Sequence, residues 1–155
     1  MKSETGLGQQ KAKDIVFRML KLRLHSEYEI RKRLIKKQFE SELIDKTIQY
    51  FKDIDFIDDR KFAKQWIVSR LRKPLGSTRI QFELRTKGVD EEILKDELVS
   101  ATKDYPEIET VTALARKRAS VYDRIPKEKM KQRVYGYLLR RGFSSYAIGK
   151  ALKEI

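Results

Sequence analysis

The sequence contains no cysteine and only three prolines and seven glycines among 155 residues. Without cysteine the chain cannot form disulfides, use a thiolate nucleophile or hold a metal through sulfur, and it suits a reducing compartment. Few prolines and glycines means few residues that break regular secondary structure. Charged residues make up 38% and hydrophobic residues 40% of the chain, a balance typical of helices with solvated outer faces. The composition therefore predicts an all-α protein.

Long apolar runs are also missing. Nowhere do about 18 apolar residues follow one another, which a membrane-spanning helix requires. The opening MKSETGLGQQKAKD lacks the apolar segment of a signal peptide. We therefore expect no contact with a membrane and a cytoplasmic location.

Catalytic motifs are equally scarce. The only histidine, His25, has no residues around it at the spacing of metal ligands or of a general base. Phosphate-cradling and nucleophile motifs do not occur. Two acidic pairs, Asp58 with Asp59 and Glu91 with Glu92, stand at expected helix starts, where carboxylates cap free amides. We expect a non-enzymatic protein without metal or other cofactor; a Mg²⁺-dependent nuclease built on the acidic pairs is a weaker alternative.

Positive charge is what the sequence has in excess. The 36 lysines and arginines against 23 acidic residues give a formal net charge of +13. Residues 108–155 alone hold 12 basic and 4 acidic residues. Such a surplus favours a polyanionic partner, because neutralised phosphates release their condensed counterions. Nucleic acid, or a protein wrapped around it, is the expected partner class.

The sequence repeats one unit three times. Residues 76–89, GSTRIQFELRTKGV, align without gaps with residues 26–39, SEYEIRKRLIKKQF, and residues 130–143, MKQRVYGYLLRRGF. The fifth position is apolar, the ninth is leucine and the twelfth is basic in every copy. The thirteenth is glycine in the two later copies and Gln38 in the first. Offsets of 50 and 54 residues between copies leave room for three short helices in each.

Apolar residues four positions apart predict amphipathic helices in each copy. Gly88 and Gly142 suit the left-handed position after a helix, and Ser41, Asp90 and Ser144 can cap the helix that follows. The predicted helices are 12–24, 27–37, 41–53, 58–72, 77–87, 91–102, 108–122, 127–141 and 145–154.

Three tandem helix-turn-helix-like repeats follow from this pattern: the first repeat at residues 1–57, the second at 58–107 and the third at 108–155. Neighbouring repeats should contact only each other, which predicts an elongated, curved monomer.

Four aromatic residues lie at helical spacing beside apolar neighbours, and we expect them in the core: Phe62, Trp66, Phe82 and Tyr105. For Trp66 a second interpretation is a partly exposed anchor for a partner.

Basic residues gather in three candidate binding sets. The first repeat contributes Arg31, Lys32, Arg33, Lys36 and Lys37. The second repeat contributes Arg70, Arg72, Lys73 and Arg79 around its turn. The third contributes Arg116, Lys117, Arg118, Arg124, Lys127, Lys129, Lys131, Arg133, Arg140 and Arg141, interleaved with Tyr122, Tyr135 and Tyr137. A solvated helix face is the alternative for any one of them. Sequence-specific base reading is less expected, because two of the helices after the turns begin with acidic residues.

Residues 57–93 resemble the central signature of the RecX family of recombinase regulators. The matching features are a D-D-x-x-F-A start at Asp58, a basic residue at Arg70, and G-x-x-x-I-x-x-E-L-x-x-K-G-V ending at Val89. Departures are Gln38 in place of glycine in the first copy and Tyr137 in place of the acidic residue before leucine in the third.

The resemblance implies tandem three-helix repeats and a regulator of homologous recombination, DNA repair and the SOS response. Its partner would be the RecA filament, whose groove it would occupy while inhibiting ATP hydrolysis, filament extension and strand exchange. Single- or double-stranded DNA would be a weak, sequence-independent second partner. The alternative is a free-standing helix-turn-helix DNA-binding protein acting as a transcriptional or architectural factor.

Overall fold

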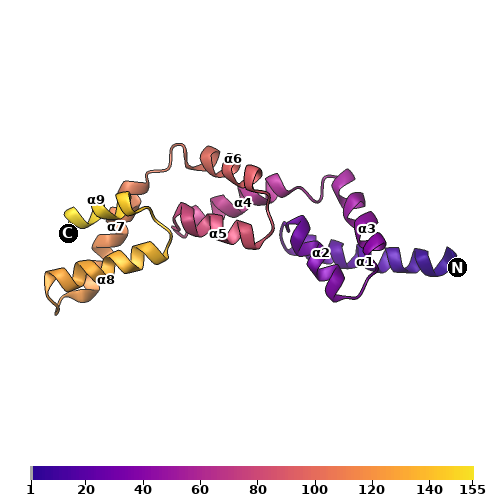
Figure 1. The fold of residues 1–155 in the computed structure, drawn as a ribbon, viewed down its shortest axis with the longest axis horizontal. Coiled ribbons are helices and arrows are strands. Elements are labelled where there is room, and N and C mark those ends of the chain that lie inside the picture. Colours follow the sequence, from indigo (N-terminus) through magenta and orange to yellow (C-terminus); the bar gives the residue numbers. More distant parts are fainter. Residues whose placement is uncertain (1) are drawn as a thin grey trace. The chain divides into compact units, whose positions relative to one another are not determined.

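The computed structural model describes the backbone of residues 2–155 and the side chains of residues 6–155. In this part of the chain there are nine α-helices, one 3₁₀ turn and no strand, which confirms the predicted all-α class (Figure 1). The α-helices are α1 (Lys2–Leu22), α2 (Glu27–Lys36), α3 (Ser41–Asp53), α4 (Asp59–Leu71), α5 (Ser77–Thr86), α6 (Glu91–Thr102), α7 (Glu107–Ala119), α8 (Lys127–Arg140) and α9 (Ser145–Lys153).

Helix α1 differs most from the prediction, because it begins at Lys2 instead of residue 12. The polar segment with Gly6 and Gly8 gave no start signal, yet it continues the helix. A methyl group on Gly8 would meet Leu43 of α3 at 3.4 Å, so α1 passes close to α3 there. Helix α7 ends at Ala119, and the 3₁₀ turn Ser120–Tyr122 completes the segment predicted as one helix.

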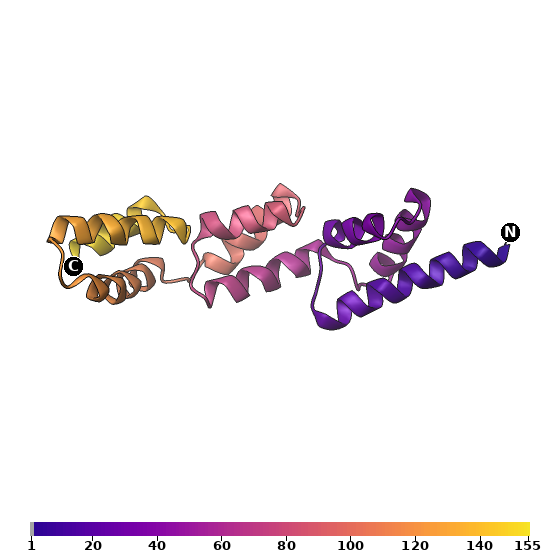
Figure 2. The same cartoon turned by 90° about the horizontal axis from the view of Figure 1, so that it is seen from below.

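The first three helices lie together, as do the last three (Figures 1 and 2), and each group encloses a hydrophobic core. Helices α1, α2 and α3 bury Ala12, Val16, Ile30, Leu34, Ile44, Ile48 and Phe51 together with Ile57. Helices α7, α8 and α9 bury Val111, Ala115, Val134, Leu138, Ala147, Ile148 and Ala151 together with Phe143. Each core therefore forms from one apolar stripe per helix, as the four-residue spacing predicts.

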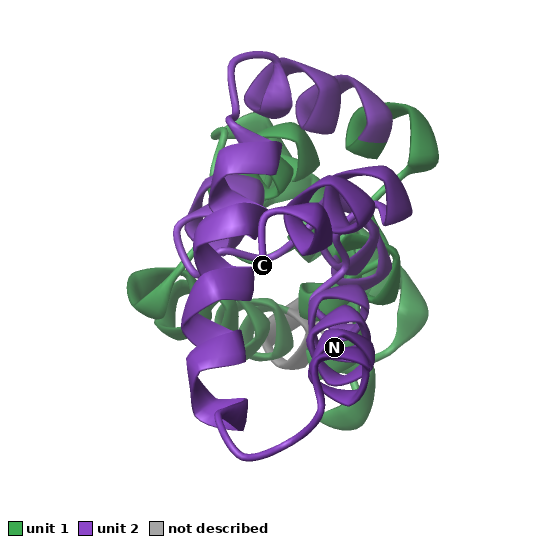
Figure 3. Ribbon diagram, turned by 90° about the vertical axis from the view of Figure 1, so that its left-hand side faces the viewer, with its two compact units in different colours: residues 1–65, 84–94 green, residues 66–83, 95–155 purple. Residues whose placement is uncertain are grey.

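Two of the aligned positions have the same burial in all three copies. The fifth and ninth positions are fully buried in each: Ile30, Leu34, Ile80, Leu84, Val134 and Leu138. By its internal contacts the chain separates into two compact units, residues 1–65 with 84–94 and residues 66–83 with 95–155 (Figure 3).

The turn after the second helix of each copy has one geometry. Its thirteenth position is left-handed in every case, with φ of 64° at Gln38, 71° at Gly88 and 88° at Gly142. The following backbone N–H donates to the carbonyl five residues earlier, from Phe39 to Leu34, from Val89 to Leu84 and from Phe143 to Leu138. This bond belongs to the Schellman motif, which ends a helix at a left-handed residue. The prediction for the two glycines is confirmed, and Gln38 adopts the same conformation.

Helix caps agree with two predictions and correct a third. The Asp90 carboxylate accepts from the Glu92 amide at 2.9 Å, and Ser144 Oγ accepts from the Ala147 amide at 3.2 Å. Ser41 is the first residue of α3 and not its cap, so that prediction was wrong. Glu40 occupies the cap position without a side-chain hydrogen bond. Its longer side chain is a poorer cap than aspartate or serine.

The aromatic residues expected in the core separate into three groups. Phe62 is buried, with 2% of its surface exposed, as predicted. Trp66 and Tyr105 are only partly buried. Phe82 is 61% exposed, so its assignment to the core was wrong. It follows Gln81 and precedes Glu83 on a face of α5 outside the stripe of Ile80 and Leu84.

Candidate functional site

The start of α2 is fixed by residues of the second repeat. Ser26, which is fully buried, forms a capping box with Glu29: its Oγ accepts from the Glu29 amide at 3.2 Å, and its own amide donates to the Glu29 carboxylate at 3.1 Å. The same hydroxyl donates to the Lys87 carbonyl at 2.6 Å. At the neighbouring amide, Glu27 N–H donates to the Asp59 carboxylate at 2.9 Å. The helix start therefore doubles as a junction between repeats.

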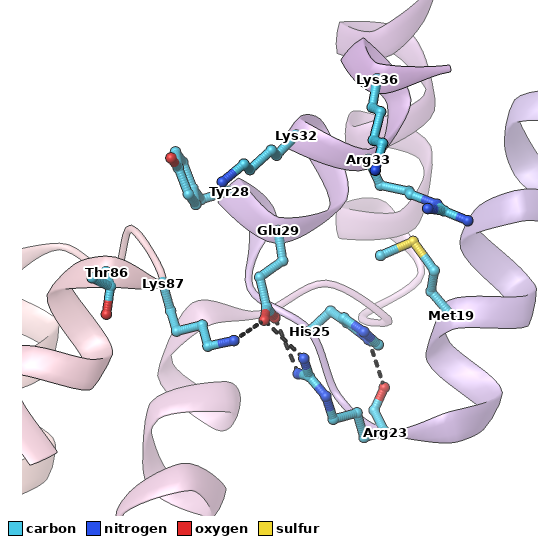
Figure 4. Close-up of a pocket in the computed structure, with 10 residues that line it drawn as sticks. All are labelled: Met19, Arg23, His25, Tyr28, Glu29, Lys32, Arg33, Lys36, Thr86 and Lys87. Carbon is cyan, nitrogen blue, oxygen red and sulfur yellow. Dashed lines mark hydrogen bonds and ion pairs between the residues drawn. The ribbon is translucent and has the colours of Figure 1, made fainter.

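Glu29 is the charged centre of this junction (Figure 4). Its carboxylate lies 2.8 Å from the Arg23 guanidinium and 2.6 Å from the Lys87 ammonium. Burial by itself raises the pKa of Glu29, but hydrogen bonds from Arg23, Lys87 and the Ser26 amide outweigh burial and lower it to about 2. His25 lies beside them with Nδ1 2.9 Å from the Arg23 carbonyl oxygen. Burial, followed by the Arg23 charge, lowers the pKa of His25, which keeps the ring neutral.

The second and third repeats meet in the same way. The Gly76 amide donates to the Arg141 carbonyl at 2.8 Å, and the Thr78 amide donates to the Gly142 carbonyl at 3.1 Å. The Arg141 guanidinium donates to the carbonyl of Pro74 at 2.9 Å and also to that of Lys73. In both junctions the twelfth and thirteenth positions of one repeat contact the first to fourth positions of the repeat before it.

Close approach explains why two of the three turns contain glycine. A Cβ atom on Gly88 would lie 2.4 Å from the Tyr28 Cβ, and one on Gly142 would lie 2.3 Å from the Arg79 amide nitrogen. Both distances are shorter than real Cβ contacts allow. Gln38 is exposed, so a side chain is accommodated at this turn. Position thirteen requires glycine only where another repeat packs on it.

Two of the basic residues expected at the second repeat's turn belong to an internal tie between α4 and α5. Glu83 accepts from Arg70 Nε at 2.6 Å, from Arg79 Nε at 3.2 Å and from the indole of Trp66 at 3.0 Å. The Arg70 guanidinium also lies 4.1 Å from the centre of the Trp66 ring. Burial by itself raises the pKa of Glu83, but the hydrogen bonds from Arg70, Arg79 and Trp66 outweigh burial and lower the pKa below its usual value. Arg72 and Lys73 are exposed.

In the first repeat the candidate set divides into one paired and four exposed residues. Arg31 pairs with Asp45 at 2.7 Å and with Glu27 at 3.6 Å, which holds α2 against α3. The other four are exposed and have no carboxylate partner among the described residues: Lys32, Arg33, Lys36 and Lys37. Only Lys32 has an aromatic neighbour, with its ammonium 5.9 Å from the Tyr28 ring centre.

The third repeat combines arginines with tyrosines. The Arg118 guanidinium lies 4.8 Å from the Tyr137 ring centre and 5.3 Å from that of Tyr122. Arg133 lies 5.4 Å from the Tyr122 ring, and Arg141 lies 5.5 Å from the Tyr137 ring.

The remaining cations of this repeat differ in their partners. Arg116 approaches Glu154 at 3.7 Å across two exposed side chains, a contact of little energetic weight. Six further members of the candidate set have neither a carboxylate nor an aromatic partner among the described residues: Lys117, Arg124, Lys127, Lys129, Lys131 and Arg140. Within the candidate set, these six are the cations best placed to contact a partner.

A cationic pocket of about 530 Å³ opens beside the first junction (Figure 4). Its lining is Met19, Arg23, His25, Tyr28, Glu29, Lys32, Arg33, Lys36, Thr86 and Lys87. A second pocket of about 330 Å³ shares Met19 and Arg33 with it and adds Ile15, Arg18, Leu22 and Lys37. Sequence reasoning found the basic cluster of α2 but missed Arg18 and Met19 on α1 and Arg23 directly after it. The four- and three-residue spacing of Ile15, Met19 and Leu22 along α1 was the available signal.

Among the described residues no group of three or more histidine or acidic side chains is placed to hold a metal ion. Asp58 accepts from the amides of Arg60 and Lys61, so it caps α4 as predicted, whereas Asp59 accepts from Glu27. No helix in the described part of the chain is long and apolar enough to cross a membrane.

Sequence models of the RecX family match three segments of this chain. The first three-helix domain of RecX matches residues 12–51, the second matches residues 58–98 and the third matches residues 106–152.

Individual relatives agree with this match. A protein named Regulatory protein RecX from Chlorobium phaeobacteroides is 35% identical over 147 residues, which cover 94% of each chain. The protein of the same name from Haemophilus influenzae is 33% identical over 84% of this chain and 85% of its own length. That from Clostridium acetobutylicum is 32% identical over 84% of this chain, but the match spans only 62% of the longer relative.

Solved structures share the fold. The crystal structure of RecX from Lactobacillus salivarius has a TM-score of 0.84 at 23% identity and covers 96% of this chain and 97% of that one. A second structure, described as a crystal structure of regulatory protein RecX, has a TM-score of 0.83 at 25% identity and covers 98% of this chain and 74% of that one. With three domain matches in order and relatives above 30% identity over most of the chain, this protein belongs to the RecX family.

Proposed function

We propose that this protein is a non-enzymatic regulator that binds the RecA–DNA filament and inhibits its ATP hydrolysis, extension and strand exchange. The observation behind the proposal is family membership through all three domains, with the central signature at residues 58–89 intact. The RecX resemblance supplies RecA as the partner. The inhibitory effect on the filament follows from the same resemblance.

The charges of the third repeat support this role. Six of its candidate cations have neither a carboxylate nor an aromatic partner among the described side chains, and a surface of this kind attracts a polyanion through counterion release. Arg118 and Arg141 are less suited to a direct contact, because the former stacks on tyrosines and the latter holds the carbonyls of Lys73 and Pro74. The contact with the filament is therefore assigned to the exposed cations.

DNA-dependent ATP hydrolysis by RecA provides the direct test. Substoichiometric protein should lower the hydrolysis rate on single-stranded DNA. The variant Lys117→Glu/Arg124→Glu/Lys127→Glu should inhibit at least about tenfold less at equal concentration, because three attractive charges become repulsive. A matched variant, Lys46→Glu/Lys61→Glu/Lys64→Glu, makes the same change of net charge outside all three candidate sets and should inhibit like the parent. Unchanged ATP hydrolysis at every protein ratio would contradict the proposal.

The arginine–tyrosine cluster of α7 and α8 favours one second candidate, a free-standing DNA-binding protein. Aromatic rings beside cations form stacking platforms for single-stranded nucleic acid, and Tyr122 and Tyr137 of the cluster are half-buried beside arginines. Base reading through the helices after the turns is disfavoured, because α3 and α6 begin with acidic residues. A gel-shift series without RecA separates the two: tight, salt-resistant and sequence-dependent binding would support this second candidate.

A further inference from the structure

Two pockets beside the first repeat share Met19 and Arg33, and together we call them the α1–α2 groove. Part of their lining is apolar and comes from α1, with Ile15, Met19 and Leu22. Leu22 is 85% exposed, a large apolar surface left in water at the end of a helix. The groove therefore offers hydrophobic contact as well as charge.

Nearly all the charged side chains that line the groove are positive. The larger pocket is lined by five cations and one carboxylate, Glu29, which Arg23 and Lys87 already neutralise. The smaller pocket is lined by Arg18, Arg33 and Lys37 and by no acidic residue. By contrast, the pocket of about 470 Å³ between α7 and α9 has three cations and two carboxylates. Anionic groups should thus be favoured in the α1–α2 groove in particular.

Lys37 lacks the hydrogen-bond acceptor that its counterparts in the other two repeats have. Lys37, Lys87 and Arg141 occupy the twelfth position, and both Lys87 and Arg141 donate to oxygen atoms of the preceding repeat. Lys87 donates to the Glu29 carboxylate, and Arg141 donates to the carbonyls of Lys73 and Pro74. Lys37 is exposed and has no such acceptor among the described residues. An oxygen acceptor from another molecule would complete the pattern.

We propose that the α1–α2 groove binds an acidic amphipathic peptide segment of a partner protein. Carboxylates of the segment pair with Arg18, Arg33 and Lys37, and its apolar side chains cover Met19 and Leu22. The positive charge of the lining favours an acidic occupant. The apolar lining residues favour a peptide over a phosphodiester chain, because a phosphodiester chain has no aliphatic side chains to contact them.

A second copy of this chain is a poor occupant by the same criterion. In the third repeat the segment aligned with the one that Lys87 contacts is Met130–Arg133, which lies one turn inside α8, contains Lys131 and Arg133 and follows Lys129. Lys37 of one copy would then face Lys131 and Arg133 of the other, and these like charges would repel each other. The site goes beyond the proposed function and does not depend on RecA being the partner.

Fluorescence anisotropy with a defined peptide tests the proposal. The probe is a labelled peptide of about 14 residues, long enough for a helical face, with leucine every three or four positions and glutamate between them. We expect saturable binding to the full chain. Arg33→Glu/Lys37→Glu should weaken it at least about tenfold, and Leu22→Gln at least about threefold, because they remove charge pairing and apolar contact respectively. All three side chains are exposed, so circular dichroism should show unchanged helicity.

Controls separate the groove from general attraction between charges. Lys61→Glu/Lys64→Glu has the same net charge as the double variant in the groove but lies outside both pockets, and it should bind the peptide like the parent. The proposal is overturned if the peptide does not bind, if both double variants weaken binding equally, or if Leu22→Gln has no effect. It is also overturned if an oligothymidine of about 20 nucleotides displaces the peptide and its own binding depends on Arg33 and Lys37 but not on Leu22.

Discussion

At the scale of single residues, the thirteenth position of each repeat shows how packing determines what the backbone tolerates. All three residues are left-handed, but only Gly88 and Gly142 face another repeat at a distance that excludes a Cβ atom. Gly88→Ala should lower the free energy of unfolding by about 2 kcal/mol or more, from left-handed strain and the clash with Tyr28. Gln38→Gly should change it by less than about 1 kcal/mol. Urea denaturation measures both, and equal losses would contradict the explanation.

Glu29 gives a prediction that depends on pH. Its pKa is about 2 in the folded protein, against 4.5 for an unperturbed glutamate, so it stabilises the fold fully above about pH 4.5 and loses that effect as pH falls towards 2. Glu29→Gln should cost about 1–3 kcal/mol near neutral pH, because Arg23 and Lys87 lose a charged acceptor. The difference between parent and variant should shrink between about pH 4.5 and pH 2 in urea titrations. A constant difference would show that the carboxylate charge does not matter.

At the scale of helices, the tie between α4 and α5 has an optical reporter. Trp66 is the only tryptophan, and its indole donates to Glu83 beside Arg70. Glu83→Ala should lower the free energy of unfolding by about 1–3 kcal/mol, since Trp66 and Arg70 lose their shared acceptor. It should also shift the tryptophan emission to longer wavelength. Glu92→Ala, at an exposed residue of α6, should leave the emission unchanged; a matching shift there would refute the assignment.

Helix positions were largely predictable from the sequence because they depend on local spacing. The stripe of Ile80 and Leu84 recurs in every copy, and the left-handed turn follows from a helix that ends before glycine. The early start of α1 was missed because its polar opening has two glycines and no apolar residues at helical spacing. The cap at Glu40 was missed although the alignment places Glu40 opposite Asp90 and Ser144.

The candidate site was less predictable, because pairing across long separations leaves no periodic signal. The i, i+4 pair of Arg79 with Glu83 was visible in the sequence, but the approach of Arg70 to Glu83 depends on how α4 meets α5. Likewise Arg141 lies 67 residues from Pro74, whose carbonyl it binds. A count of basic residues therefore overstated the number that remain free for a partner.

At the scale of the whole molecule, cations divide into those that hold repeats together and those that face solvent. Adjacent residues provide a matched comparison: Arg141 donates to Lys73 and Pro74, whereas Arg140 is exposed and has no carboxylate partner among the described residues. Arg141→Ala should lower the free energy of unfolding by about 1–3 kcal/mol, and Arg140→Ala by less than about 0.5 kcal/mol.

The two variants should rank in the opposite order when binding to a polyanion, and not stability, is measured. Arg140→Ala should weaken binding to heparin or single-stranded DNA and reduce its salt dependence, because one exposed charge is lost. Arg141→Ala should change binding less, provided it is measured well below the unfolding temperature. Thermal unfolding and salt titrations together check the comparison, and identical effects of the two variants on both measurements would contradict it.

The junctions also affect how such a chain can evolve in length. In each one the turn of one repeat contacts the helix start of the repeat before it; Asp59 adds a contact in the first, and Lys73 and Pro74 add contacts in the second. Gene duplication of a single repeat would therefore supply both halves of a new joint. A tandem copy of residues 58–107 would place Lys87 opposite Arg79 where the existing joint has Glu29. An acidic residue at position 79 would remove that repulsion but would also break the bond from Arg79 to Glu83. Lengthening the array therefore needs a compensating change within α5, but none in a hydrophobic core.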